Sequence, residues 1–112
     1  MKTTPSILIG ARRTIKPQDV ILFTADINYT QVYFCNGRKL IVATPLKIIE
    51  KRFAECSEFF RTHRSYLINL NYVKQFASIR NELFVQMEND YRVAVSRRKR
   101  EAFKHRILAI SH

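Results

Sequence analysis

Two short basic clusters contain the residues of this chain whose types and spacing could do chemistry. In the first, "FFRTHRSYLINLN", the stretch from Arg61 to Ser65 places two arginines, a histidine and two hydroxyls between apolar residues. In the second, four consecutive basic residues run from Arg97 to Arg100. An arginine fork can bind two acceptors at once, on a phosphate or on guanine O6 and N7. Both clusters suit an anionic partner, although the first could also be a catalytic cluster or a solvated turn.

Catalysis is the weaker interpretation of the first cluster. Nucleophilic catalysis needs a serine or cysteine beside a base that a third group orients. His63 and Ser65 are two positions apart, and in a strand that spacing brings side chains to one face by geometry alone. With two glycines, the chain cannot build a glycine-rich phosphate loop. We therefore predict that the protein is not an enzyme, and a hydrolase using His63 and Ser65 is the last alternative.

The histidines and cysteines do not form a pattern typical of a metal or redox centre. His63, His105 and His112 are far apart in sequence and lack Cys or His neighbours at ligand spacing. Cys35 and Cys56 form neither a CxxC pair nor a disulfide framework. We expect Cys35 to be a small buried strand residue and Cys56, after a helix, to be partly exposed. We expect no metal, no cofactor and no small-molecule substrate.

The charge of the chain is its strongest bulk feature. Among 112 residues, 20 Lys and Arg stand against 9 Asp and Glu, and the resulting net charge of +11 points to a polyanion, with nucleic acid first. Charge that only aids solubility is the alternative. The length predicts one domain over residues 1–112, with 1–6 as a short N-terminal extension. Because no apolar run is long enough to span a membrane and no signal peptide is visible, we expect a cytoplasmic protein that does not bind membranes.

Alternating apolar residues and turn residues predict a mostly antiparallel β domain. Asn36-Gly37 predicts a tight hairpin turn of type I′, in which both residues adopt positive φ. Strand and helix do not alternate along the chain, so a parallel sheet is not expected. The predicted strands cover residues 6–9, 20–23, 31–35, 39–43, 73–79, 82–88 and 91–95.

Two segments change to helical spacing. In "ATPLKIIEKRFAEC", Thr44 can cap a helix and Pro45 suits its first position, so we predict a helix of about ten residues. In "SRRKREAFKHRILAISH", apolar residues recur every three to four positions and predict a C-terminal amphipathic helix. The basic run 97–100 stands at the N-terminal end of this helix, where the dipole disfavours each cation by about 0.3–1 kcal/mol. An anion bound there would explain the run; a solvated basic turn is the alternative.

A polar loop, "ADINYTQ", lies between two predicted strands, and together with the basic clusters it makes the chain resemble the LytTR family of bacterial DNA-binding domains. "FFRTHRSYLINLNYV" is similar to the family signature of an aromatic, Arg, x, His, x, Ser, an apolar trio, Asn and an apolar position. "DINYTQVYFCNGRKLIVATPLKIIEKRF" resembles its hairpin and helix, and "YRVAVSRRKREAF" its closing strand and Ser-Arg-Arg start of the last helix. The resemblance covers about residues 7–103. We expect Asn69, in the signature, to be a turn-former that binds its own backbone.

This resemblance implies elongated, stacked antiparallel β-sheets of about ten short strands, with one internal and one C-terminal helix. It also implies that loops, rather than a recognition helix, read successive major grooves of double-stranded DNA. Carried over by position, the base-reading residues are Tyr29, Arg64 and Arg97. The residues implied for contacts to the DNA backbone are Asn28, His63, Ser65, Arg98 and Arg100. For Arg61 two roles stay open, contact with the DNA or pairing with a surface carboxylate.

The implied partner is a pair of direct repeats in double-stranded DNA, with one domain on each repeat and a homodimer on the DNA as one arrangement. Only residues 1–6 precede the module, so we expect either a stand-alone regulator or a piece of a longer chain of the response regulator family. The predicted function is sequence-specific DNA binding in bacterial transcription regulation. An RNA-binding β domain that stacks bases on exposed aromatics, with Tyr29 as the loop aromatic, is one alternative. A protein-interaction module with incidental basic loops is the other.

Overall fold

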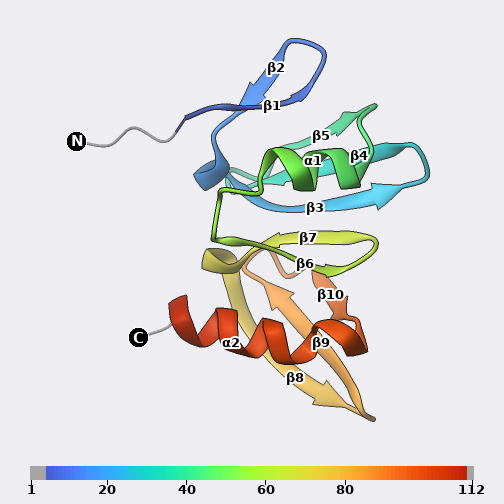
Figure 1. Ribbon diagram of the computed structural model, residues 1–112, viewed down its shortest axis with the longest axis vertical. Coiled ribbons are helices and arrows are strands. Elements are labelled where there is room, and N and C mark those ends of the chain that lie inside the picture. Colours follow the sequence, from blue (N-terminus) through green and yellow to red (C-terminus); the bar gives the residue numbers. More distant parts are fainter. Residues whose placement is uncertain (1–4, 111–112) are drawn as a thin grey trace.

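The structure is a computed structural model that describes residues 5–110, and in this part of the chain ten strands and two α-helices form three layers (Figure 1). The elements in chain order are β1 (Ile7–Gly10), β2 (Arg13–Ile15), η1 (Pro17–Asp19), β3 (Val20–Asp26), β4 (Tyr29–Phe34), β5 (Lys39–Val42), α1 (Leu46–Arg52), β6 (Phe59–His63), β7 (Tyr66–Asn69), η2 (Leu70–Tyr72), β8 (Val73–Ile79), β9 (Glu82–Met87), β10 (Arg92–Val95), η3 (Arg97–Lys99) and α2 (Arg100–Ile110), where η is a 3₁₀ turn. The predicted mostly-β fold with one internal and one C-terminal helix is confirmed.

All strand pairs are antiparallel, and they form three sheets. The middle layer is a five-stranded sheet in the order β5-β4-β3-β7-β6. The β1–β2 hairpin and α1 lie over one face of this sheet, and the sheet β10-β9-β8 with α2 lies over the other (Figure 1). The strand β2 was not predicted, because its three residues carry one buried apolar side chain, Ile15, among basic neighbours.

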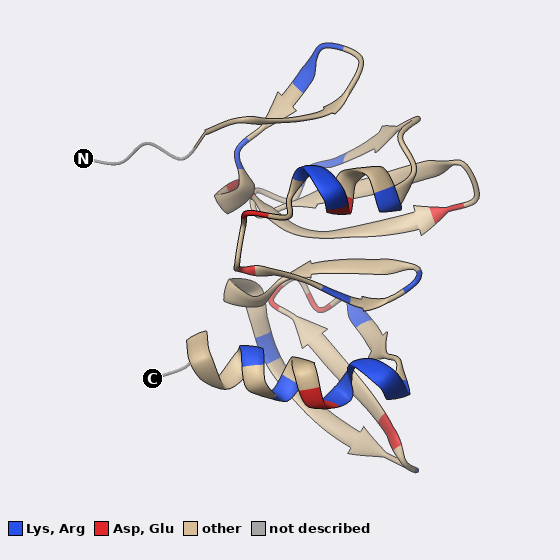
Figure 2. Ribbon diagram, viewed as in Figure 1, with Lys and Arg blue, Asp and Glu red and all other residues tan. Residues whose placement is uncertain are grey.

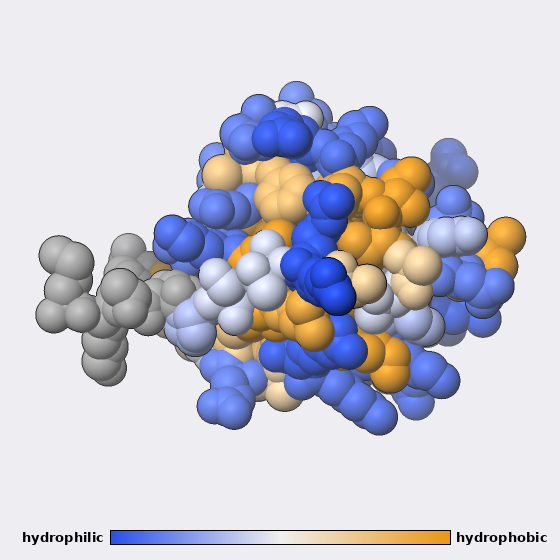
Figure 3. All heavy atoms as spheres, turned by 90° about the horizontal axis from the view of Figure 1, so that it is seen from above, coloured by the Kyte–Doolittle hydropathy of each residue, from blue (hydrophilic) through white to orange (hydrophobic). Residues whose placement is uncertain are grey.

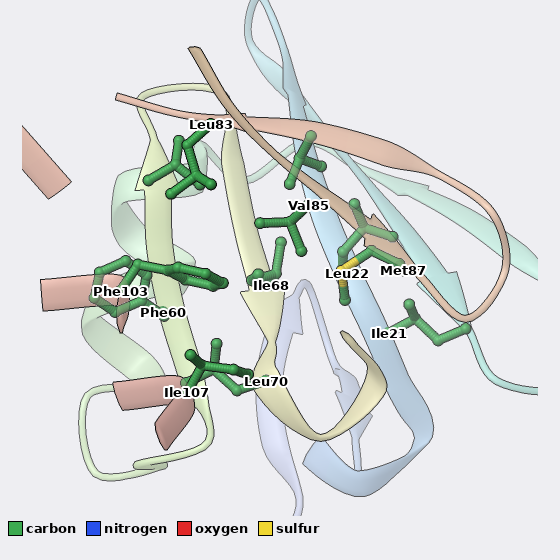
Figure 4. Packing of buried hydrophobic residues seen from close by; sticks show 12 residues of the cluster. Ile21, Leu22, Phe60, Ile68, Leu70, Leu83, Val85, Met87, Phe103 and Ile107 are labelled. Atoms are coloured by element: carbon green, nitrogen blue, oxygen red, sulfur yellow. The ribbon is translucent and has the colours of Figure 1, made fainter. Parts of the chain in front are cut away.

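Two hydrophobic clusters fill the spaces above and below the middle sheet. The upper cluster has as buried members Ile9, Ile15, Val20, Phe23, Val32, Val42, Leu46, Ile49, Phe53, Phe59 and Leu67. The lower cluster has Ile21, Leu22, Phe60, Ile68, Leu70, Leu83, Val85, Met87, Val93, Val95, Phe103 and Ile107. Figure 4 shows the lower cluster, in which side chains of the middle sheet meet those of β9 and α2. Each face of the middle sheet is therefore buried.

The central strand β3 supplies side chains to both clusters, and a bulge decides which residue goes where. Its pairing with β4 shifts register between Val20 and Leu22. As a result Ile21 and Leu22, although consecutive, both belong to the lower cluster, while Val20 and Phe23 belong to the upper one. The near-continuous apolar run of this strand is what a strand buried on both faces requires.

The upper layer and β5, the edge strand of the middle sheet, leave some apolar side chains exposed. Leu8 of β1 and Ile41 of β5 are both exposed apolar residues. The space-filling view from this side shows such residues as separate patches with hydrophilic side chains between them (Figure 3). Scattered exposed apolar residues of this kind are normal on protein surfaces and do not by themselves mark a docking site.

Three local predictions were wrong. In the β4–β5 hairpin only Gly37 has positive φ, at 89°, so the turn is not type I′. The Gly37 N–H donates to the Phe34 carbonyl at 3.1 Å and the Phe34 N–H donates to the Arg38 carbonyl at 2.9 Å, which is a three-residue loop with a bulge at the glycine. The Asn36 side chain accepts the Arg38 N–H at 2.9 Å and so stabilises this alternative. Cys35 opens the loop and is consequently exposed, not buried.

The third error concerns the start of α1. Thr44 does not cap the helix: Pro45 occupies the N-cap position and no side chain caps it. The Thr44 carbonyl instead accepts a hydrogen bond from the Thr30 hydroxyl at 2.6 Å, which ties this connection to β4. The helix has seven residues instead of about ten, because Phe53 leaves helical geometry at φ −97° and ψ 11° to enter the upper cluster.

Asn69 has the structural role that the sequence predicted. Its side-chain oxygen accepts the Asn71 N–H at 3.0 Å, which forms the start of η2. Its amide nitrogen also donates to the Val20 carbonyl at 3.0 Å and to the Pro17 carbonyl at 3.4 Å. One buried side chain therefore joins the end of β7 to the start of β3.

We predict that Asn69→Ala lowers the free energy of unfolding by about 2 kcal/mol, because buried carbonyls lose their donor. Urea denaturation measures this change. Asn71→Ala is the matched control, since Asn71 is exposed and contributes only its backbone N–H; it should change stability by less than about 0.5 kcal/mol. Equal effects of the two substitutions would contradict the role of Asn69.

Candidate nucleic-acid interface

Three loops lie along one edge of the molecule, at the right of Figure 1. The first is the β3–β4 turn with Ile27 and Asn28, followed by Tyr29 at the start of β4. The second is the β6–β7 turn, Arg64-Ser65, and the third is the segment 96–99 between β10 and α2. These loops contain all the residues that the sequence assigned to DNA contact, apart from His63 and Arg100, which adjoin the second and third loops. The structure thus brings the two basic clusters and the polar loop to one edge.

Backbone hydrogen bonds hold the three loops to one another. The Ala25 N–H donates to the Ser65 carbonyl at 2.9 Å and links the strand of the first loop to the second. The Ser96 N–H donates to the Thr62 carbonyl at 2.8 Å and links the third loop to the strand that carries the second. The first link continues the pairing of β3 with β7, and the second joins β6 of the middle sheet to the end of β10 in the lower sheet. The second loop therefore lies between the other two.

Arg61 fixes the backbone of the second loop. Its Nε donates to the His63 carbonyl at 2.8 Å and a terminal nitrogen donates to the Arg64 carbonyl at 2.5 Å. The other terminal nitrogen forms an ion pair with Glu50 of α1 at 2.6 Å. The Arg61 side chain is 16% exposed and the Glu50 side chain 44%, so the arginine is screened from water while the carboxylate remains partly solvated. Of the two roles left open by the sequence, pairing with a carboxylate is the one that the structure shows.

The other arginine of this cluster is placed differently. Arg64 is exposed, and within residues 5–110 its guanidinium has no hydrogen bond or ion pair. A register shift between Arg61 and His63 bends β6 just before the turn. The same residue type three positions apart therefore has two roles, one arginine holding the loop and the other available to a partner.

His63 and Ser65 contact each other, but without the geometry of a catalytic pair. The Ser65 backbone N–H donates to His63 Nδ1 at 3.1 Å, whereas the Ser65 hydroxyl has no bond to that ring among the described residues. Since Nδ1 is the acceptor, a neutral His63 carries its proton on Nε2. That N–H is a donor for a further group, such as a phosphate oxygen.

The third loop divides its four basic residues into two kinds. Arg97 and Arg98 are exposed and, in the described part of the chain, have no side-chain partner. Lys99 is half-buried, with its ammonium 5.8 Å from the centre of the Phe60 ring. Arg100 is half-buried too and donates to the carbonyl of Asn81 in the β8–β9 turn. Arg97 and Arg98 are therefore available to a ligand, whereas Lys99 and Arg100 also make contacts within the fold.

The first loop carries an exposed aromatic ring and no basic residue. Tyr29 is 51% exposed, and Asn28 beside it is exposed as well. Figure 2 shows Lys and Arg at the second loop and at the start of α2, but an acidic residue, Asp26, at the end of β3. The edge is consequently basic at its second and third loops and not at its first.

Sequence patterns did not indicate two residues of this edge. Glu50 was not singled out, because only the tertiary fold brings this residue of α1 to Arg61 of β6. Ile27 was not singled out either, although an isoleucine between Asp26 and Asn28 in a hairpin turn is unusual where Gly or Asn is expected. The signal available in the sequence was an isoleucine at a turn position where glycine or asparagine is usual.

Residues 5–110 contain no group of three or more His, Cys, Asp or Glu that could hold a metal ion; His112 lies outside them. In this same part of the chain, no helix has the length and apolar character needed to cross a membrane.

The family model of the LytTr DNA-binding domain matches residues 11–108. The chain belongs to the LytTR family of DNA-binding domains. Among solved structures, it is similar to the LytTr DNA-binding domain of a Bacillus cereus protein described as a methyl-accepting/DNA response regulator. That likeness has a TM-score of 0.72 at 20% identity and covers 96% of this chain and 98% of the other, and at this identity it concerns the fold. No curated protein matches the chain in sequence.

A row of aromatic rings lies below the second loop of this LytTR domain. His63 and Tyr66 have ring centres 5.5 Å apart, Tyr66 and Tyr91 6.4 Å, and Tyr91 and Tyr33 5.0 Å. Burial, and next the repulsion from Tyr33, raise the pKa of Tyr91 to about 12. The Tyr91 hydroxyl thus stays protonated well above the ordinary tyrosine pKa of about 10.

We predict that the free energy of unfolding falls as pH rises from about 10 to about 12, because the unfolded chain then releases a proton that folded Tyr91 keeps. Urea denaturation at a series of pH values measures the fall. Tyr91→Phe should make it shallower without abolishing it, since the pKa of Tyr72 is also raised to about 12. The same slope for the variant and the original protein would be the contrary result.

We also predict that Arg61→Ala lowers the free energy of unfolding by about 2–3 kcal/mol, since it removes an ion pair and two hydrogen bonds to the loop. Arg64→Ala should change it by less than about 0.5 kcal/mol. Urea denaturation of both variants separates the two roles. Glu50→Gln, which keeps an acceptor for Arg61 but loses the charge, should give an intermediate loss. If Arg64→Ala destabilised as much as Arg61→Ala, the division of roles would be wrong.

Proposed function

We propose that this LytTR domain binds double-stranded DNA sequence-specifically, with the three loops of its basic edge in the major groove, and so regulates transcription in a bacterium. The observation that carries the proposal is that exposed side chains without partners among the described residues stand on loops whose backbone is held in place by hydrogen bonds. Arg64, Arg97 and Tyr29 face no partner in residues 5–110, yet the hydrogen bonds between Ala25 and Ser65 and between Ser96 and Thr62 hold their loops in place. Such preorganisation lowers the entropy lost on binding.

In this proposal Arg64 and Arg97 read guanine O6 and N7 with their planar forks. Tyr29 contacts a base from the first loop, where the carboxylate of Asp26 makes close approach to phosphates unfavourable. The major groove is about 12 Å wide and admits a two-stranded ribbon, so a hairpin turn such as β3–β4 or β6–β7 can enter it.

Contacts to the DNA backbone come from the remaining residues of the edge. Arg98 is free to bind a phosphate, and His63 Nε2 and the Ser65 hydroxyl can each donate to one. Arg100 is half-buried and donates to the Asn81 carbonyl, so in this proposal it contributes its positive charge to the DNA backbone while it holds the β8–β9 turn. Asn28 completes the set proposed for backbone contact.

We extend the proposal to two direct repeats, each bound by one domain. The long axis of the molecule is 42 Å, somewhat longer than the ~34 Å of one turn of B-DNA. A single domain therefore covers about one turn, and a second copy bound to a second repeat adds discrimination.

Selection from random duplexes first identifies the preferred site, and gel shifts then compare that site with a scrambled duplex and with single-stranded RNA. Arg64→Ala and Arg97→Ala should each lose roughly 5- to 150-fold of the preference for the selected site, which corresponds to one bidentate base contact. Arg98→Ala should weaken binding to every duplex alike and reduce the salt slope by about one. Circular dichroism verifies that each variant is folded.

Lys51→Ala is the charge-matched control, since Lys51 is exposed in the last turn of α1 and belongs to none of the three loops. It should leave the preference for the selected site unchanged. Full specific binding by both Arg64→Ala and Arg97→Ala would refute the assignment of base contacts. Tight binding of the RNA with weak binding of every duplex would refute the DNA proposal itself.

A further inference from the structure

Ile27 combines two features that folding alone does not favour. Its side chain is 91% exposed at the tip of the first loop. Its backbone has φ 54°, in the left-handed region where a β-branched side chain is strained. The four other non-glycine residues with positive φ in residues 5–110 are Arg12, Arg80, Asn81 and Asp90, none of them β-branched. Glycine or asparagine at position 27 would make the same turn with less strain.

The surroundings of Ile27 do not supply a packing reason for its side chain. It belongs to neither hydrophobic cluster. Its neighbours Asp26 and Asn28 are polar and exposed, so it is not the centre of a contiguous apolar patch. A strained, exposed apolar residue at the tip of a loop therefore points to a role in binding.

The position of Ile27 limits what it can bind. It precedes Asn28 and Tyr29, and the bond between Ala25 and Ser65 holds this turn beside the loop of Arg64. An isoleucine side chain has no hydrogen-bonding group for a phosphate or a base edge. The apolar group that the major groove presents is the C5-methyl of thymine.

Building on the proposed function, we propose that Ile27 is a specificity-determining residue that contacts the C5-methyl group of one thymine in the bound site. The exposed side chain then becomes buried against the methyl group on binding. The backbone strain at Ile27 lowers the stability of the fold, and the contact with the methyl group offsets this cost when DNA is bound.

The test uses the selected duplex with each thymine replaced, one at a time, by deoxyuridine, which removes only the methyl group. The original protein should lose about 4-fold in affinity at one position, as expected for one buried methyl group. Ile27→Asn should bind the thymine and deoxyuridine duplexes equally at that position, and its urea midpoint should move to higher concentration. Ile27→Val, which keeps a β-branched apolar side chain, should retain the discrimination.

Ile41→Asn is the matched control, because Ile41 is an exposed isoleucine of β5 outside the three loops and without positive φ. It should neither change discrimination nor raise the urea midpoint. The proposal is overturned if no thymine position is sensitive, if Ile27→Asn keeps the sensitivity, or if Ile27→Asn fails to gain stability. In each of these cases the original protein still prefers its site, so the proposed function stands. If it prefers no duplex at all, both proposals are wrong.

Discussion

Apolar side chains of β3 pack into the hydrophobic clusters on both faces of the five-stranded sheet, and β7 beside it does the same through Leu67 and Ile68. Burial on both faces excludes water from the hydrogen bonds between these strands, which makes their positions costly to change. The upper and lower layers each need the middle sheet to bury their own apolar faces. The positions of the three loops therefore depend on strands of the middle sheet, which pack against both the upper and the lower layer.

The loops inherit this rigidity through a few polar contacts. The second loop is joined to β3 by the Ser65 carbonyl, and the strand that carries it is joined to the third loop by the Thr62 carbonyl. Arg61 completes the arrangement from inside, because its three nitrogens bind two loop carbonyls and Glu50 of the covering helix. A surface ion pair contributes little in general, but here the arginine is mostly buried and its other nitrogens bind two loop carbonyls. Through this side chain, the position of α1 helps to fix the backbone of the β6–β7 turn.

The sequence predicted the layers of the fold better than its turns. Alternation of apolar residues located most strands, and the helical spacing located both helices, because burial on one or two faces leaves a repeating pattern. Asn69 was also predicted, since an asparagine before a turn has few other uses. The hairpin at Asn36 was predicted too, but its turn type was wrong, because the Asn36 side chain stabilises a longer loop than type I′. Cys35 followed that loop to the surface.

The sequence predicted which residues lie at the three loops of the edge, but not the different roles of Arg61 and Arg64. The family resemblance singled out Tyr29, Arg64 and Arg97, but nothing local to the sequence distinguishes Arg61 from Arg64. That distinction depends on Glu50 and on a bulge in β6, both of which exist only after the layers have assembled. The unusual backbone of Ile27 also appears only in three dimensions, since propensity would place another residue in that turn.

The independence of Arg64 from its own loop has a consequence for how such domains diversify. The backbone at position 64 is held by a neighbour's guanidinium and by strand pairing, and the side chain contributes nothing to that support. An exchange of side chain at this position therefore alters the surface presented to a partner while the fold keeps its stability. Mutations there can be sampled freely during evolution, whereas those at Arg61 are filtered by folding before any new preference can be selected. With the base contact proposed for Arg64, a single substitution at this position would change the preferred DNA sequence without a cost in folding.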